Sequence, residues 1–268
     1  MIIYQESMDI YHANPAMGSG DIRDFMRAPR LFRDRMDGLL PAIESDAMAF
    51  GTAFHCAVLE PTKFADNYAV KPEGMSFATK EGKAWREEHE GSTIISAKDK
   101  GRIDFMILRM PGEARAFLVG GRSEVTFRVD FSGFAVQCRA DHISNDFAMM
   151  ADLKTISAIE KVEKEVFARG YHIQARWYQR IVERETGKLP EFRLVFCESA
   201  PPYRWRIVSL DGDYLNIADE KIDEAFSGIA ACEKSGEWPD HKPLLMHLTP
   251  PPWLSGDEFT INEDGISL

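Results

Sequence analysis

Three charged side chains stand at a spacing that could bind and cleave a phosphodiester. Asp141 is followed by ten residues and then by Asp152-Leu153-Lys154. Two carboxylates that converge on one point repel each other unless a cation lies between them, and hard oxygen ligands select Mg²⁺ or Mn²⁺. A neighbouring lysine could position or deprotonate a water and stabilise charge on the phosphorane. The pattern suits a metal-dependent phosphodiesterase, and a surface salt bridge is the alternative because Asp-x-Lys is common in strands.

The elements that must position these residues are strands. Three β-rich runs predict a meander: residues 122–131, 134–143 and 146–155, with turns at Ser132-Gly133 and Ser144-Asn145. Because side chains alternate along a strand, Asp152 and Lys154 should point to one side and Leu153 into the core. Asp141 should reach the same point from the neighbouring strand. The Leu153 carbonyl is a further candidate metal ligand.

Helices and a second hairpin surround the meander. Caps and periodicity predict helices over residues 20–36, 47–60, 96–109, 158–169, 171–186 and 211–235, and a closing hairpin over 191–199 and 203–209. The helix over 171–186 lies between Gly170 and Gly187, and it carries Gln174 and Tyr178 on one face, where an amide and a phenol can hydrogen-bond phosphate oxygens. These elements predict an α/β fold with a mixed central sheet flanked by helices.

The ordered motifs resemble those of the PD-(D/E)XK nuclease superfamily, in the branch of RecB-type nucleases, phage lambda exonuclease and, most closely, RecE (exonuclease VIII). The motifs in order are Gly51-Thr-Ala-Phe-His55, Asp141, Asp152-Leu-Lys154 and Gln174-Ala-Arg-Trp-Tyr178. They span roughly residues 20–210. The Pro-Asp of the superfamily name is Ala140-Asp141 here, which should not affect metal ligation.

The resemblance implies a restriction-endonuclease-like core and a magnesium-dependent exodeoxyribonuclease that degrades double-stranded DNA ends, 5′ to 3′, in phage-type homologous recombination. Mn²⁺ should substitute for Mg²⁺. The implied catalytic residues are Asp141, Asp152, Lys154, Gln174 and Tyr178, and the implied metal ligands are His55, Glu124, Asp141, Asp152 and Leu153. Processive enzymes of this type tend to form rings, so we expect a trimer or tetramer, with a single-strand annealing protein as a further partner.

Several of these assignments have plain alternatives. His55 lies on an apolar helix, where a lone histidine is usually a satisfied core residue, and Glu124 could be a solvent-facing charge at a sheet edge. For the whole chain, the alternatives are an endonuclease of the same superfamily and a catalytically inactive DNA-binding protein. The intact Asp141, Asp152 and Lys154 disfavour the inactive protein.

The net charge of −11 argues against a non-specific DNA coat, because phosphate binding relies on clustered Lys and Arg. It allows a local basic track in an acidic shell. Two stripes at helical spacing are candidate DNA contacts: Arg23, Arg27 and Arg30, one of which the resemblance places on the 5′-phosphate, and Arg176 and Arg180. The first stripe could instead be a solvated amphipathic face offset by Asp21, Asp24 and Asp34, and the second an intrahelical pattern with Glu183 and Glu185.

Length and composition predict one domain over residues 1–268, with 236–268 as a proline-rich tail packed on it or on a neighbouring subunit. Because the N-terminus lacks a charged and apolar leader and no apolar run approaches the ~20 residues of a membrane span, we expect a cytoplasmic protein. The four scattered cysteines indicate neither a zinc site nor a disulfide framework. Residues 72–120 have no assigned role.

Overall fold

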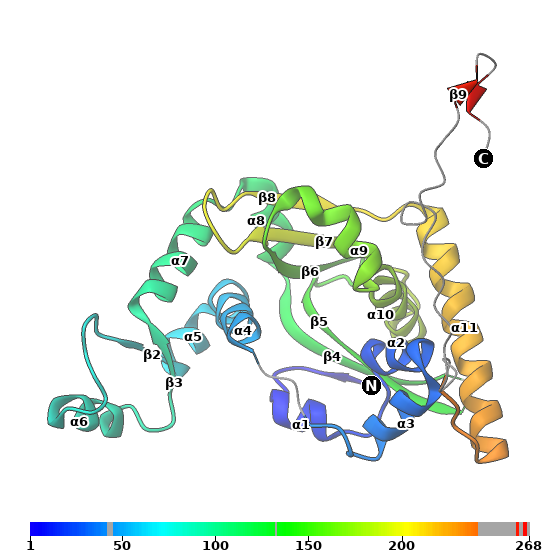
Figure 1. Cartoon of the computed structure of the whole chain (residues 1–268), viewed down its shortest axis with the longest axis horizontal. Coiled ribbons are helices and arrows are strands. Elements are labelled where there is room, and N and C mark those ends of the chain that lie inside the picture. Colours follow the sequence, from blue (N-terminus) through cyan, green and yellow to red (C-terminus); the bar gives the residue numbers. More distant parts are fainter. Residues whose placement is uncertain (42–44, 132, 241–260, 263–264, 267–268) are drawn as a thin grey trace.

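In the computed structural model, which describes residues 1–41, 45–131, 133–240, 261–262 and 265–266, a six-stranded sheet forms the centre of the molecule (Figure 1). Its order is β1-β4-β5-β6-β7-β8, with bounds Ile2–Ile3, Arg122–Phe131, Phe134–Ile143, Met149–Ile156, Glu191–Glu198 and Trp205–Val208. Only the β6–β7 pair is parallel within this sheet. The predicted meander is β4-β5-β6, and the predicted hairpin is β7-β8. The sheet is therefore mixed, as the sequence predicted.

Helices cover both faces of the sheet, and each face has its own core. On one face lie α2 (Ser19–Arg27), α3 (Pro29–Met36), α10 (Tyr171–Thr186) and α11 (Gly212–Ser235), packed around Trp177 and Phe127. On the other lie α4 (Asp46–Leu59), α7 (Ala97–Leu108) and α8 (Gly112–Leu118), packed around Phe54 and Leu153. Burial of these large apolar side chains holds the three layers together.

Helix ends agree with the sequence where a cap fixes them. Helix α10 begins after Gly170 and ends before Gly187, both in the left-handed conformation (φ 64° and 73°) that glycine adopts without strain. Ser96 caps α7, and α11 covers nearly the whole predicted range.

Three predicted helices differ from the structure. The helix expected over residues 158–169 is split into a 3-10 turn, η1 (Ile159–Lys161), and α9 (Val162–Ala168), and the Ile159 amide at its start donates to Glu198 (2.9 Å). The helix expected to be buried over residues 47–60 is α4, of which only one stripe is buried. Its other side faces solvent and a cavity. Pro29 divides the helix predicted over residues 20–36 into α2 and α3.

An arm projects from the body (Figure 1). It consists of α5 (Pro61–Asn67), β2 (Tyr68–Lys71), α6 (Lys80–Glu88) and β3 (Thr93–Ser96), and β2 pairs with β3 in parallel. The remaining N-terminal helix is α1 (Met8–Ala13). No helix in the described part of the chain is both long and apolar enough to cross a membrane.

The start of the predicted tail packs on the body. Trp238 stacks on Phe32 with ring centroids 5.7 Å apart, and the Arg30 amide donates to the Pro239 carbonyl (3.1 Å). Residues 241–260, most of the predicted tail, lie outside the described residues. Two short strands follow, β9 (Ile261–Asn262) and β10 (Gly265–Ile266), which pair with each other.

Glu198 should make stability fall in acid. Its side chain is buried (2% exposed) and accepts hydrogen bonds from Arg204 and from the Ile159 amide, which lower its pKa to about 2. Its stabilising contribution is full above the unfolded pKa, about 4.5, and is lost as the pH falls toward 2. Urea unfolding between pH 6 and 2 should show a shallower acid decline for Glu198→Gln than for wild type. The exposed control Glu183→Gln should show the same acid decline as wild type. An equal decline in Glu198→Gln would contradict the claim that protonation of Glu198 is coupled to unfolding.

Candidate active site

A cavity of about 770 Å³ lies between the sheet, α1 and α4, and it gathers the residues that the sequence singled out. Seven of them line it: His55, Glu124, Asp141, Asp152, Lys154, Gln174 and Tyr178. The side chain of Leu153 is buried in the opposite core, as the strand alternation predicted.

The three carboxylates lie in one row across three strands. The β5–β6 ladder pairs Ile143 with Met150 and His142 with Ala151, so the next pair in register is Asp141 and Asp152, where the pairing stops. The β4–β5 ladder skips the position at which Glu124 stands opposite Asp141. Like charges directly opposite each other destabilise strand pairing. The ladders are therefore interrupted where the carboxylates converge.

Asp152 is the most buried of the three carboxylates (1% exposed). Its Oδ1 accepts a hydrogen bond from Gln174 Nε2 (2.9 Å), and its Oδ2 lies 2.5 Å from Lys154 Nζ, although it receives no well-aligned hydrogen bond from the described residues. Burial disfavours the charged form of Lys154, but the carboxylates of Asp152 and Asp141 outweigh it and raise the lysine pKa. Lys154 is thus an ammonium at neutral pH, held over the ring of Tyr171 (5.2 Å).

Asp141 is held by a backbone amide and faces a neutral imidazole. Its Oδ2 accepts from the Leu153 amide (2.8 Å) and lies 3.5 Å from His55 Nδ1. Burial and the charge of Asp152 raise the pKa of Asp141 well above its usual value. Burial, together with the charge of Lys154, lowers the pKa of His55 to about 3. His55 is therefore uncharged at neutral pH and able to act as a hydrogen-bond donor or a metal ligand.

Glu124 reaches the cavity from a strained backbone. Its φ of 54° is unusual for a residue other than glycine, and such a conformation costs roughly 1–3 kcal/mol. Arg139 Nε donates to its carboxylate (2.5 Å), while burial raises its pKa. Arg139 lines the same cavity and also donates to the Glu6 carbonyl (2.7 Å). Glu124 is therefore not the edge charge that was its plain alternative.

The metal ligand set predicted from the resemblance, His55, Glu124, Asp141 and Asp152, is not assembled as a cluster. Among the residues that the structure describes, no three His, Cys, Asp or Glu side chains are placed to hold one ion. Their polar atoms contact protein partners: Arg139 on Glu124, the Leu153 amide on Asp141, and Lys154 on Asp152. The donor chemistry still fits a hard divalent cation, because two buried carboxylates converge and Asp152 Oδ2 has no well-aligned donor.

The first arginine stripe divides into one half-buried and two exposed residues. Arg27 pairs with Asp24, and Arg30 with Asp34. Arg23 has no carboxylate partner in the described part of the chain. It donates to the backbone carbonyls of Ser19 and Arg169 and packs on Gly170, where a Cβ would lie 2.8 Å from its Cδ. Gly170 precedes Tyr171, whose ring lies 5.2 Å from Lys154 Nζ, but Arg23 itself is not among the residues that line the cavity.

The second stripe does not line the cavity. Arg176 pairs with Asp219 (2.7 Å), and Arg180 pairs with Asp219 and Asp223 (3.4 and 2.8 Å), all across the interface between α10 and α11. The sequence alternative, a pattern within the helix with Glu183 and Glu185, also missed these partners. The structure therefore gives Arg176 and Arg180 a role in joining two helices.

Sequence reasoning missed the N-terminal wall of the cavity and two residues that contact its charged groups, Arg139 and Tyr171. Gln5, Tyr11 and the arm residue Lys63 line the cavity, but nothing in their local sequence indicates it. Arg139 carried a signal, since it lies two residues before Asp141 and thus shares a strand face with it. Tyr171 carried a weaker signal, since it is the first residue of the helix that carries Gln174.

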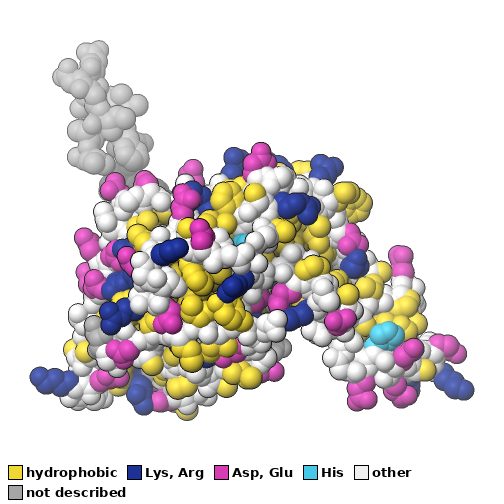
Figure 2. Space-filling view, turned by 180° about the vertical axis from the view of Figure 1, so that it is seen from behind, with side chains coloured by type: hydrophobic (Ala, Val, Ile, Leu, Met, Phe, Trp, Pro, Cys, Tyr) yellow, Lys and Arg dark blue, Asp and Glu magenta, His cyan; other side chains and the backbone are white. Residues whose placement is uncertain are grey.

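Over the face in Figure 2, Lys and Arg are scattered among Asp and Glu, with no broad basic field.

Comparisons with known proteins agree with this geometry. A crystal structure of a "Putative exonuclease" from Eubacterium rectale superposes with a TM-score of 0.65 at 18% identity, covering 96% of this chain and 100% of that chain, and so shares the fold. A second structure, SSO0001, has a TM-score of 0.25 at 16% identity over 38% of this chain and 50% of that chain, too low to inform the fold. No curated protein matches significantly. A family match covers residues 19–243, and the chain therefore belongs to the family described as "PDDEXK-like domain of unknown function (DUF3799)".

Proposed function

We propose that this protein is a deoxyribonuclease that hydrolyses phosphodiester bonds at the ends of double-stranded DNA with the help of a divalent metal ion. The observation that carries the proposal is the convergence of Asp141, Asp152 and Lys154 in one cavity, with Gln174 bonded to Asp152. PD-(D/E)XK nucleases generally use divalent metal ions, and the family description supports this reaction class.

Asp141 and Asp152 would hold Mg²⁺ or Mn²⁺, with the Leu153 carbonyl as a further oxygen ligand and with His55 and Glu124 beside them. When bound, the ion lowers the pKa of a water and neutralises charge on the phosphate. The ammonium of Lys154 orients that water and stabilises the charge that develops on phosphate oxygens. Its raised pKa favours this role over that of a general base.

Gln174 and Tyr178 complete the site in different ways. Gln174 fixes the orientation of the Asp152 carboxylate, as partners of ligating carboxylates commonly do. Burial raises the pKa of Tyr178 well above its usual value, so the phenol stays protonated and can donate a hydrogen bond to a phosphate oxygen. Both residues come from one face of α10, which places them side by side over the carboxylates.

We further propose that the enzyme is an exonuclease that starts from a 5′ end and acts in homologous recombination. This proposal is supported by Arg23, an arginine without an ion-pair partner in the described chain, which packs on Gly170 at the start of the helix that carries Gln174 and Tyr178. We extend the proposal to a trimeric or tetrameric ring, whose mass light scattering would measure. The ring would act together with a single-strand annealing protein. An endonuclease remains the second candidate, and the intact charged triplet disfavours an inactive DNA-binding protein.

Titration with Mg²⁺ tests the metal function through Gln174. Wild-type protein should cleave linear duplex DNA when Mg²⁺ is present and stop when EDTA removes it. Gln174→Ala frees the Asp152 carboxylate, so half-maximal cleavage should require about 10–100-fold more Mg²⁺. Gln179→Ala is a matched control, because this glutamine of the same helix donates to the Pro190 carbonyl, away from the cavity. Equal Mg²⁺ requirements of both variants, or cleavage that persists in EDTA, would contradict the assignment.

A further inference from the structure

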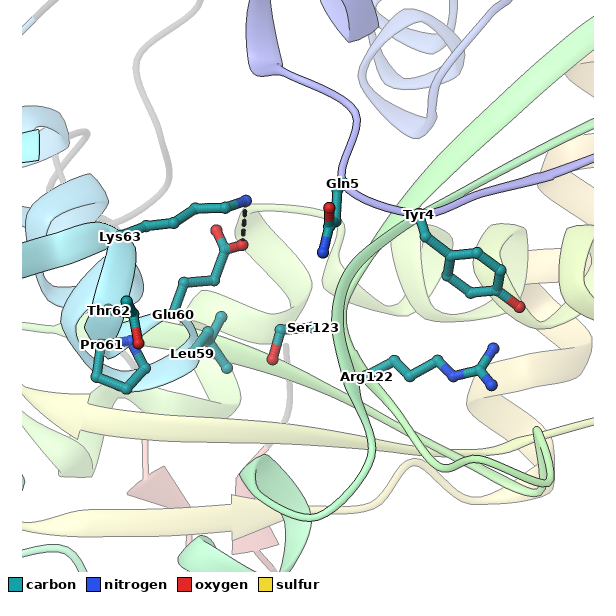
Figure 3. A pocket seen from close by; sticks show the side chains of 9 residues that line it. All are labelled: Tyr4, Gln5, Leu59, Glu60, Pro61, Thr62, Lys63, Arg122 and Ser123. Carbon is teal, nitrogen blue, oxygen red and sulfur yellow. Dashed lines mark ion pairs between the residues drawn. The ribbon is translucent and has the colours of Figure 1, made fainter. Parts of the chain in front are cut away.

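A second cavity, of about 700 Å³, adjoins the active site and has no role in the mechanism above (Figure 3). It shares Gln5, Glu60 and Lys63 with the catalytic cavity. Its other lining residues include Tyr4, Arg122 and Ser123. We call this cavity the side slot. Its volume lies in the range of sites for small organic ligands.

The row of catalytic carboxylates leads directly to the side slot. The β1–β4 register pairs Ile2 with Phe127 and Ile3 with Thr126, and if continued it places Gln5 opposite Glu124. Gln5 lines both cavities and thus lies at the boundary between the carboxylates and the side slot. Figure 3 shows its side chain between the Lys63–Glu60 pair and the Tyr4–Arg122 pair. A strand of DNA whose phosphate lies over the carboxylates would enter the slot at Gln5.

The two walls of the slot present the groups that bind single-stranded nucleic acid. On one wall, the guanidinium of Arg122 lies over the ring of Tyr4, 4.6 Å from its centroid, and Tyr4 is 47% exposed. Arg122 has no carboxylate partner among the described residues. On the other wall, Lys63 pairs with Glu60 (2.5 Å). Aromatic rings and guanidinium planes stack on bases, and lysines contact phosphates.

The wall that carries Tyr4 is held rigidly. Gln5 adopts a left-handed backbone (φ 63°), which turns the chain between the exposed Tyr4 and the buried Glu6. Arg128 donates to both carboxylate oxygens of Glu6 (2.8 and 2.9 Å), and Arg139 donates to its carbonyl. Such anchoring pre-organises a binding surface and lowers the entropy lost on binding. The family match begins at residue 19, so it does not include Tyr4 and Gln5.

We propose that the side slot binds one unpaired nucleotide of the DNA strand next to the cleaved bond, with its base stacked on the Tyr4–Arg122 pair and its phosphate near Lys63. This proposal rests on the proposed nuclease function, since it gives the slot part of the same substrate. A base inside a duplex cannot reach a stacking partner in a side cavity. The terminal base pair must therefore open as the strand enters, which suits an enzyme that acts on DNA ends.

The test uses a short single-stranded DNA with 2-aminopurine near its 5′ end, whose fluorescence falls when the base stacks. In EDTA, where no cleavage occurs, wild-type protein should quench it on binding. Because a stacked base contributes ~1–3 kcal/mol, the double variant Tyr4→Ala/Arg122→Ala should bind about 5–150-fold more weakly and lose the quenching. Tyr4→Phe, which keeps the ring, should retain it.

The matched control is Arg206→Ala, which removes an exposed arginine from β8, the opposite edge of the sheet. It should bind and quench like wild type. No quenching by wild-type protein, or equal binding by the double variant, would overturn the subsite. A different result would separate the two claims. If wild-type protein quenches the fluorescence and the double variant does not, but wild-type protein fails to cleave DNA with Mg²⁺, the nucleotide-binding slot stands and the nuclease function is removed.

Discussion

Lys154→Ala should reduce the cleavage of duplex DNA by at least about 10²–10³-fold, the cost of removing one preorganised donor from a developing charge. Lys154 is the cation that contacts Asp152, and its ammonium is stabilised by both carboxylates. Without it, the attacking water loses a positioning group and the phosphate oxygens lose a charge. The loss should appear in kcat under saturating Mg²⁺. Lys164→Ala, at an exposed lysine of α9, is the control and should keep the wild-type rate.

Asp152→Asn is a second test of the chemistry, because it removes a metal ligand and keeps Lys154. Each variant breaks the buried ion pair and should therefore lower the melting temperature, although Asp141 remains to offset the charge of Lys154 in Asp152→Asn. We expect a comparable loss of cleavage in a variant that still unfolds cooperatively. Near wild-type rates in both variants would remove the active-site assignment, whatever their stability.

A 5′-phosphate should make a linear duplex a better substrate than the same duplex with a 5′-hydroxyl. Bidentate contact of a guanidinium with a terminal phosphate would bring the first scissile bond over the metal site. Arg23 is our candidate for this contact, since it forms no ion pair among the described residues, whereas Arg27 and Arg30 pair with Asp24 and Asp34. Arg23→Ala should abolish the preference for phosphorylated ends and leave the Mg²⁺ requirement unchanged.

Arg30→Ala is the control for this experiment, because Arg30 is exposed and paired with Asp34 on α3. It should preserve the difference between the two kinds of end. Equal initial rates of wild-type protein on both ends would eliminate the phosphate anchor. A preference that survives in Arg23→Ala but not in Arg30→Ala would assign the anchor to the other arginine.

The sequence predicted the elements whose signals are local. Gly170 and Gly187 flank α10, and Ser96 caps α7. These residues fix the ends of the helices through contacts with backbone groups only a few residues away. The alternation around Leu153 predicted which side chains of β6 face the cavity. The ordered motifs predicted which distant residues converge, and the structure brings six of them into one cavity: His55, Asp141, Asp152, Lys154, Gln174 and Tyr178.

The features that the sequence could not predict depend on tertiary partners and on register. The sequence predicted that Arg176 and Arg180 on α10 contact the DNA backbone. The carboxylates that pair with them come from α11, some forty residues later in the chain. The arrangement of Glu124, Asp141 and Asp152 in one row requires the register of three strands, which a single sequence does not specify. The N-terminal segment meets the site through contacts between residues more than a hundred positions apart in the chain, such as that of the Glu6 carbonyl with Arg139.

The central claim, metal-dependent hydrolysis from DNA ends, is tested most directly by one assay on linear and covalently closed circular duplex of the same sequence. The linear DNA carries a label at one 5′ end, and each substrate is incubated with Mg²⁺ or with EDTA. We expect the linear DNA to be degraded only with Mg²⁺, with early release of the 5′ label, and the closed circles to survive. Efficient cutting of the circles would show an endonuclease, and intact linear DNA in Mg²⁺ would contradict the nuclease function itself.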